Sequence, residues 1–331
     1  MSNSNILSEE KINSICSNIP DIEEMENLRL KFTRRKTIFI LTSVITIILS
    51  VMIFCILYRT GNSINGPALI AGCLICAGLA IFYAAYVSPL SGKLKSHFSK
   101  NIIEHYVRSI LSDAQYEPEN CHPLQTYYES LLFMIDVDRH TGANYVHGMF
   151  DRTDVSFSYM HTEYKQVEHT AKGTKTTWHT IFRGIFMCAD SNKRFSGQTI
   201  VLPDTAEKYL GGFGKWLQKK AGNTVGEMVY MENVEFEKKF VVYSTDPVEA
   251  RFLITPKIQE QIFKMKKMLR KDLRLSFVNN NVFIAVSRDN IFQMDTSLSF
   301  TDDKTLRYYM SDIVELLTLI HLLDLNIRIW K

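Results

Sequence analysis

Residues 37–58 read TIFILTSVITIILSVMIFCILY, and residues 67–88 read PALIAGCLICAGLAIFYAAYVS. Each stretch is 22 residues long and contains no Asp, Glu, Lys or Arg, and eight residues separate the two. At about 1.5 Å per residue, a helix of this length crosses the roughly 30 Å hydrocarbon core of a bilayer. The sequence therefore predicts a hairpin of two transmembrane helices.

The orientation of this hairpin is predicted by the basic residues that flank it. The loop between the two stretches holds only Arg59, whereas the outer flanks hold eight basic residues: Arg29, Lys31, Arg34, Arg35, Lys36, Lys93, Lys95 and Lys100. Because cytoplasmic flanks of membrane helices carry the excess of Lys and Arg, we expect both termini to face the cytoplasm. A signal peptide is disfavoured, since a second apolar stretch follows the first.

The rest of the chain divides into an arm, a stalk and a large domain. Residues 1–36 are expected to form a cytoplasmic helical arm, and residues 89–123 a helical stalk followed by a linker that contains two prolines. Residues 124–331 have the mixture of aromatic, β-branched and charged residues that is typical of a packed globule. We expect a cytoplasmic domain there.

This domain is predicted to be α+β, with a mainly antiparallel sheet and flanking helices. Two long strands are expected over 155–167 and 176–188, joined by a turn, with shorter strands before and after them and a short helix over 125–133. The remaining short strands are expected at 144–150, 199–202, 228–231, 240–243, 273–277, 282–286 and 327–330. Helical periodicity predicts helices over 256–271 and 303–323.

Composition and motifs exclude several classes of function. The net charge is +3, and much of it flanks the apolar stretches, so we expect no nucleic acid to bind. The sequence GGFGK at 211–215 lacks the first glycine and the hydroxyl of a nucleotide-binding loop. Cys73 and Cys76 have CxxC spacing but lie in an apolar helix, where packing as small residues is the better interpretation. Cys16, Cys121 and Cys188 are expected to be reduced thiols. No cofactor and no metal are predicted.

Three stretches carry a resemblance to a known family. They are TIFRGIFMCADSNKRFSGQTIVLPD at 180–204, MENVEFEKKFVVYSTDPVEARFLITP at 231–256 and LSFVNNNVFIAV at 275–286. Together they resemble the bacterial membrane-protein family catalogued as domain of unknown function 3137, over most of the chain from residue 37 to about residue 290. The resemblance implies two N-terminal membrane helices before a cytoplasmic domain and a LemA-type membrane protein as a partner. It supplies no catalytic residues to carry over to this chain.

A basic surface is the first candidate site. In 256–271, four apolar residues share one helical face, and Lys264, Lys267, Arg270 and Lys271 lie on the other. Near an anionic leaflet such a face would contact the lipid bilayer, or else a protein partner; otherwise it is a solvated helix face. Arg251 is a further candidate for anion binding, although an ion pair with Asp246 or Glu249 is the simpler interpretation.

An acidic cluster is the alternative site. The sequence DVDRH places Asp136, Asp138 and His140 within five residues, which permits acid–base chemistry but also a loop with local salt bridges.

These observations favour a bacterial inner- or plasma-membrane protein whose cytoplasmic domain is an interaction, sensor or scaffold module. The alternatives are an uncharacterised membrane-bound enzyme that uses the acidic cluster, and an accessory subunit of a transport or envelope system.

Overall fold

The computed structural model describes residues 7–59, 65–170, 173–191, 194–204 and 226–323. The predicted strand at 327–330 and the GGFGK sequence at 211–215 lie outside these residues. The chain separates into two compact units. A helical unit comprises residues 12–105 and 294–309, and a sheet unit comprises residues 1–11, 106–293 and 310–331.

Two long antiparallel helices dominate the helical unit. Helix α2 runs from Ile22 to Arg59 and helix α3 from Asn65 to Tyr86, and both are long and apolar enough to cross a membrane. Phe39 of α2 contacts Tyr83 of α3, with ring centroids 5.2 Å apart. The apolar side chains that the structure describes on both helices are otherwise largely exposed.

Shorter helices complete this unit. They are α1 (Glu9–Ser17), α4 (Ser88–His97), the π-helix η1 (Phe98–Ile103) and the first residues of α5 (Glu104–Ile110). The stalk is thus helical, as the sequence predicts. Ile15 and Met25 of the N-terminal arm are buried.

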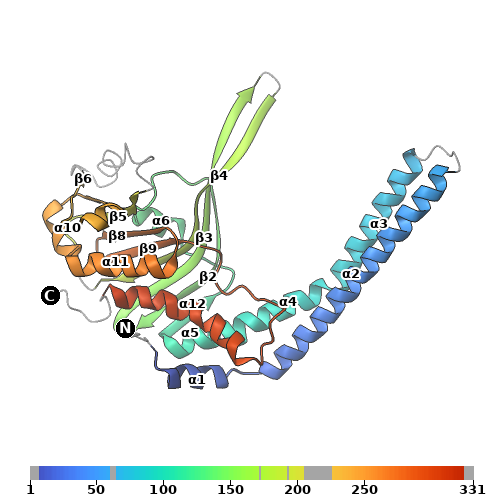
Figure 1. Cartoon of the computed structure of the whole chain (residues 1–331), viewed down its shortest axis with the longest axis horizontal. Coiled ribbons are helices and arrows are strands. Elements are labelled where there is room, and N and C mark those ends of the chain that lie inside the picture. The colour runs from blue at the N-terminus through green and yellow to red at the C-terminus, as the bar shows by residue number, and fades with distance from the viewer. Residues whose placement is uncertain (1–6, 60–64, 171–172, 192–193, 205–225, 324–331) are drawn as a thin grey trace. The chain divides into compact units, whose positions relative to one another are not determined.

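The sheet unit contains one antiparallel sheet, and nine of its strands lie in the described residues (Figure 1). Their order is β1-β2-β3-β4-β9-β8-β5-β7-β6. The strands are β1 (Ser112–Glu117), β2 (Arg139–Phe150), β3 (Thr153–Thr170), β4 (Gly173–Asp190), β5 (Thr199–Pro203), β6 (Glu227–Met228), β7 (Phe240–Ser244), β8 (Leu273–Val278) and β9 (Asn281–Ser287). The α+β class with a mainly antiparallel sheet is confirmed.

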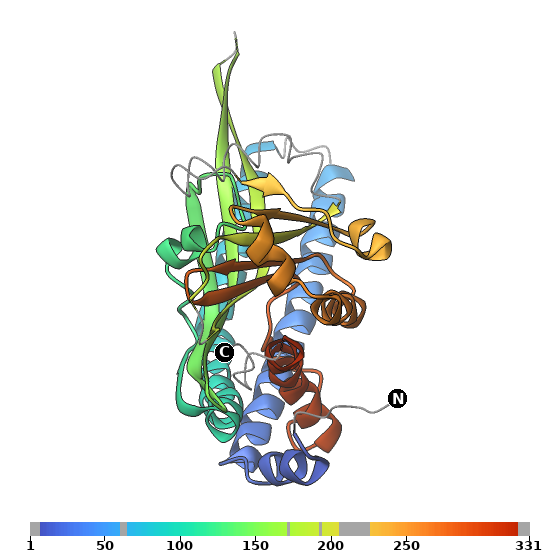
Figure 2. The same ribbon diagram turned by 90° about the vertical axis from the view of Figure 1, so that its left-hand side faces the viewer.

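Helices cover both faces of the central strands, and these helices are α6 (Leu124–Glu129), α9 (Val234–Glu237), α10 (Pro247–Leu253), α11 (Pro256–Leu269) and α12 (Asp303–Leu322). Figure 2 shows α6 on one side of the sheet and α11 on the other. Five consecutive residues of β9 are buried for this reason. Tyr127 of α6 stacks on Phe133 at 4.6 Å, within a core that includes Phe186 and Phe283.

The predicted linker over 113–123 is wrong in its first half. Residues 112–117 form β1, which pairs with β2 from Ser112↔Met149 to Glu117↔Tyr145. Both prolines, Pro118 and Pro123, follow the strand and leave its ladder intact. The sheet therefore begins before residue 124, where the sequence places the start of the domain.

Other boundaries shift by a few residues. The expected helix over 125–133 ends at Glu129, and the expected strand over 228–231 is reduced to the two residues of β6. The expected hairpin between β8 and β9 is confirmed, with Asn279 at φ 57 in its turn.

Candidate functional site: the basic end of helix α11

Helix α11 begins with a regular N-terminal cap. The Thr255 hydroxyl accepts a hydrogen bond from the backbone N–H of Ile258 at 3.3 Å, and Pro256 occupies the first turn. Four apolar side chains on one face, those of Ile258, Ile262, Met265 and Leu269, are buried as the sequence predicts. This face fixes the rotation of the helix, so its basic residues are directed to the surface.

The helix ends at Leu269, and the next residue, Arg270, caps it in the left-handed conformation at φ 52 and ψ 27. Its N–H donates to the Lys266 carbonyl at 2.9 Å, and β8 begins three residues later. Glycine is the usual residue at such a position, because a Cβ in this region costs about 1–2 kcal/mol. An arginine therefore stands where the backbone favours glycine.

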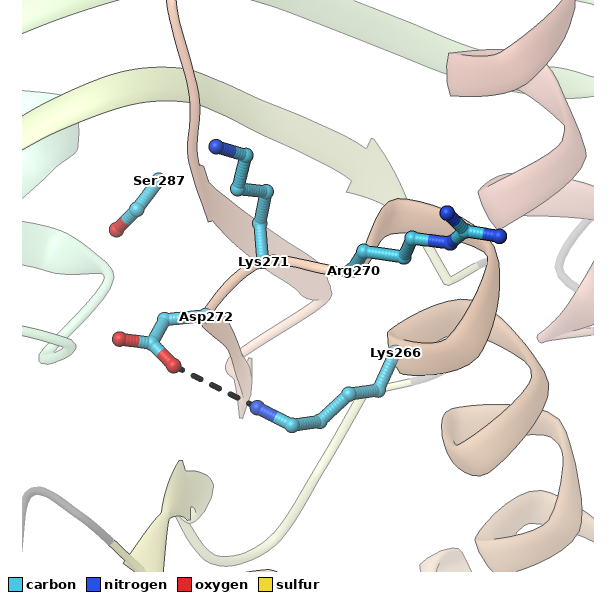
Figure 3. A pocket seen from close by; sticks show the side chains of 5 residues that line it. All are labelled: Lys266, Arg270, Lys271, Asp272 and Ser287. Atoms are coloured by element: carbon cyan, nitrogen blue, oxygen red, sulfur yellow. Dashed lines mark hydrogen bonds and ion pairs between the residues drawn. The ribbon is translucent and has the colours of Figure 1, made fainter.

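A shallow depression of about 560 Å³ lies at this end of the helix (Figure 3). Its lining contains three cations, one carboxylate and one hydroxyl, which belong to Lys266, Arg270, Lys271, Asp272 and Ser287. The Lys266 ammonium lies 3.5 Å from the Asp272 carboxylate. In Figure 3 the Arg270 side chain extends away from this pair, so the cations do not converge on one point.

The four predicted basic residues differ in how far they are neutralised. All four are exposed, and Lys264 forms an ion pair with Glu260 at 3.1 Å. Among the residues that the structure describes, no ion-pair partner faces Lys267, Arg270 or Lys271. Lysines in the last turn also offset the helix dipole, which accounts for part of this arrangement without any ligand. Arg270 and Lys271 lie beyond that turn.

Arg251 lies apart from this depression and pairs with neither expected acid. The Asp246 side chain caps α10 by accepting from the N–H groups of Val248 and Glu249, both at 3.0 Å. The Glu249 carboxylate accepts from the N–H of Gly197 at 2.6 Å and from that of its neighbour, residue 196, at 2.9 Å. Arg251 instead donates to the Pro247 carbonyl at 3.3 Å. Both carboxylates therefore have structural roles.

Asp138 and His140 of the acidic cluster contact different partners in the structure. Asp138 accepts from the backbone N–H of Lys165 at 2.7 Å, and the exposed Asp136 lies before the strand. His140 belongs to β2, where its Nε2 lies 3.4 Å from the Cys121 sulfur. Burial lowers the pKa of His140 and raises the pKa of Cys121, so both groups are neutral near pH 7. In the described ranges, no group of three or more His, Cys, Asp or Glu side chains could hold a metal ion.

His122 is a buried polar residue that the sequence analysis does not single out. Its ring nitrogens lie 2.8 Å from the Ser158 hydroxyl and 2.9 Å from the Ser156 hydroxyl. Burial lowers its pKa to about 3. Both nitrogens are occupied within the core, so the residue has a structural role, and no motif around it in the sequence indicates this.

Comparison with known proteins finds a family model that matches part of the chain. Residues 180–325 match the family described as "Protein of unknown function (DUF3137)". The resemblance read from the sequence is thereby confirmed, although the DUF3137 match begins at β4 and ends beyond α12. The matched segment contains the basic end of α11 and Arg251, and it excludes the residues of the acidic cluster.

No curated protein matches the chain. A solved structure, the crystal structure of the mycobacterial trehalose monomycolate transport factor A, TtfA, is similar at 12% identity, with a TM-score of 0.31. That similarity covers 68% of this chain and 96% of the other. At this identity and TM-score it carries no argument about function.

Proposed function

We propose that the chain is a membrane-tethered binding module of a bacterial inner or plasma membrane. In this proposal α2 and α3 cross the bilayer, and the α+β domain presents the basic end of α11 to an anionic surface. The observation that carries it is the group of three exposed cations, Lys267, Arg270 and Lys271, without acidic partners in the described part of the chain.

The direction of the side chains favours an extended surface over a small ligand. A phosphate-sized anion requires donors that converge, whereas an anionic leaflet attracts cations that are spread over a patch. The basic side chains around the depression point in different directions (Figure 3). Each basic residue near such a leaflet contributes about 1 kcal/mol, so three unpaired cations orient the domain but do not anchor it. The anchor is the pair of apolar helices.

The membrane topology in this proposal rests on the basic flanks of the two helices. Eight basic residues lie outside the hairpin and one lies inside it, which supports cytoplasmic termini. The domain boundaries at residues 36, 88 and 123 remain predictions, with β1 as a reason to place the start of the domain earlier.

Lysine footprinting tests the proposed surface in the full chain. The protein is reconstituted in nanodiscs of neutral phosphatidylcholine, or of phosphatidylcholine mixed with phosphatidylglycerol, and is acetylated briefly. We expect Lys267 and Lys271 to react several-fold more slowly in the anionic discs, and salt to abolish the difference. Lys264 is the matched internal control, because the carboxylate of Glu260, 3.1 Å away, offsets its attraction to an anionic leaflet. Equal reactivity in both lipids would contradict the proposal.

The accessory role in a transport or envelope system and the LemA-type partner remain predictions. Purification from membranes in mild detergent, followed by mass spectrometry, tests both. A variant in which Lys267, Arg270 and Lys271 are changed to Gln distinguishes a partner that uses the basic surface from one that binds elsewhere.

A further inference from the structure

Strands β3 and β4 continue as a two-stranded ribbon beyond the rest of the sheet (Figure 1). The pairing of β2 with β3 ends at Arg139↔Glu163, and the pairing of β4 with β9 begins at Gly184↔Ser287. Beyond Glu163, β4 is the only strand that pairs with β3 in the described part of the chain. A two-stranded ribbon in water is marginally stable, and its free edges can pair with further strands.

The open edge of β3 is protected where the ribbon leaves the sheet, near Glu163 and Lys165. Asp138 comes directly before β2 and lies beside β3. Its backbone N–H donates to the Glu163 carbonyl at 3.0 Å, and its carboxylate accepts from the Lys165 N–H at 2.7 Å. Its carboxylate therefore occupies the position where a further strand would bond. The same contact shows that the peptide groups of Lys165 point away from β4.

The orientation of the Lys165 peptide groups determines which peptide groups of β4 point to the open edge. Lys165 pairs with Trp178, and in an antiparallel ladder such a pair directs the peptide groups of both residues outward. Alternate residues of β4 therefore also direct their N–H and C=O groups to the open edge. These residues are Thr174, Thr176, Trp178 and Thr180.

This β4 edge has little of the usual protection: a bulge at Ile181 lies at its base, and Lys175 is the one charged residue between Thr174 and Thr180. Edge strands are commonly protected by charges, prolines, bulges or a covering element. The four outward residues are uncharged and exposed, and no described strand pairs with them. The ribbon is braced on its faces instead, since Arg139 lies 3.8 Å from the Trp178 ring and Tyr164 stacks on His179 at 5.0 Å. These contacts support the ribbon and leave the β4 edge open.

We propose that this edge pairs antiparallel with the same edge of a second copy of the chain, about a two-fold axis at Thr177. The strand is self-complementary in this register. Thr174 would face Thr180 of the second copy, and Thr176 would face its Trp178. Pairs of Thr with Thr, and of aromatic with β-branched residues, are favourable across strands. Lys175 already faces Glu168 within its own chain, so pairing brings no uncompensated charge together.

Cysteine cross-linking of the full chain in membranes tests this register. At the two-fold axis, residues 177 of both copies would form a pair with Cα atoms about 4.5 Å apart, which is within the range of a disulfide. We expect Thr177→Cys to give a disulfide-linked dimer under mild oxidation. Lys175→Cys is the matched control, because its two copies would lie roughly 13 Å apart along the strands and should cross-link far less. The unsubstituted chain measures the background from the six native cysteines.

Proline variants test the edge itself. Thr176→Pro removes an outward N–H that the ladder with β3 does not use, so the ribbon should fold while pairing between copies is lost. Val167→Pro removes an outward N–H on the opposite edge and should leave the dimer intact. We expect Thr176→Pro to abolish the cross-link of Thr177→Cys. Four results would overturn the proposal. They are equal cross-linking at 175 and 177, no cross-linking, a cross-link that survives Thr176→Pro, and a cross-link to another protein.

Discussion

Glu26 and Arg29, three residues apart on α2, form a two-point ion pair within the helical unit. The Glu26 carboxylate accepts from Arg29 Nε at 2.8 Å and from Nη2 at 2.6 Å. It also accepts from the Ser299 hydroxyl and from the Phe300 N–H, both at 2.9 Å, while Arg29 donates to the Thr296 carbonyl at 2.9 Å. The pair therefore binds segment 294–302 to the helix that continues into the first apolar span.

Acid should release this segment. The hydrogen bonds from Arg29 lower the pKa of Glu26 from 4.5 to about 2. A carboxyl whose folded pKa is depressed stabilises the fold above its unfolded pKa, and this stabilisation is lost as the pH falls from about 4.5 towards 2. Hydrogen exchange at Phe300, corrected for intrinsic rates, should accelerate in that window. Unchanged protection down to pH 2 would contradict this assignment.

Glu26→Gln should produce the same release at neutral pH. The amide keeps the shape of the side chain but leaves Arg29 buried without its counter-charge, and hydrogen bonds to charged groups contribute about 1.5–3 kcal/mol each. We expect faster exchange at residues 299 and 300 and a lower melting temperature. Glu23→Gln, on the same helix and exposed, is the matched control.

Arg270→Gly should raise the stability of the fold and weaken its attraction to an anionic membrane. Glycine accepts φ 52 without strain, so the variant should unfold at a higher temperature, with a gain of roughly 0.5–1 kcal/mol. It also removes one of three unpaired cations and should weaken attraction to an anionic leaflet by about 1 kcal/mol, or about five-fold. Lysine footprinting and thermal melting check the two effects, and Lys264→Gln controls for loss of charge alone. A less stable variant would show that the arginine itself stabilises the cap.

Several features were predictable because one physical signal dominates them. The apolar helices lack charges over 22 residues, and α11 repeats its apolar side chains with helical spacing. Strand β1 was missed because SDAQYE contains only a weak alternation and few apolar residues. The partners of Asp138 and His140 were not predictable, because Asp138 bonds to Lys165 and His140 contacts Cys121, and both partners are distant in sequence. The contact of Cys121 with His140 joins residues 19 apart, which no local pattern reveals.

The separate partners of Asp138 and His140 lead to a prediction about catalysis. Changing Asp136 and Asp138 together to Asn should leave complementation of a deletion strain within a few-fold of the unsubstituted gene. The amide oxygen introduced at position 138 can still accept the Lys165 N–H, and exposed charges of this kind contribute about 0–1 kcal/mol. A folded double variant that behaves as a complete null would revive the enzyme alternative.

The membrane topology is testable with reporter fusions. With eight basic residues outside the hairpin and one inside it, a fluorescent protein fused after Lys331 should fluoresce, and alkaline phosphatase at the same site should be inactive. Moving three of the outer basic residues into the loop after Arg59 should reduce this asymmetry and give mixed reporter signals. High phosphatase activity without fluorescence in the unsubstituted chain would refute the cytoplasmic domain.

His122 should make the sheet unit sensitive to pH between about 6.5 and 3. Burial lowers its folded pKa to about 3, so below 6.5 the unfolded chain binds a proton that the folded chain does not. The stability is therefore complete above pH 6.5 and falls as the pH falls towards 3. His122→Phe keeps the aromatic contacts with Tyr145 and Phe186 but removes the ring's hydrogen bonds to the Ser158 and Ser156 hydroxyls, which contribute about 0.5–1.5 kcal/mol each. The variant should melt at a lower temperature at pH 7 and lose less stability between pH 6.5 and pH 5. An unchanged slope would assign the acid sensitivity to other groups.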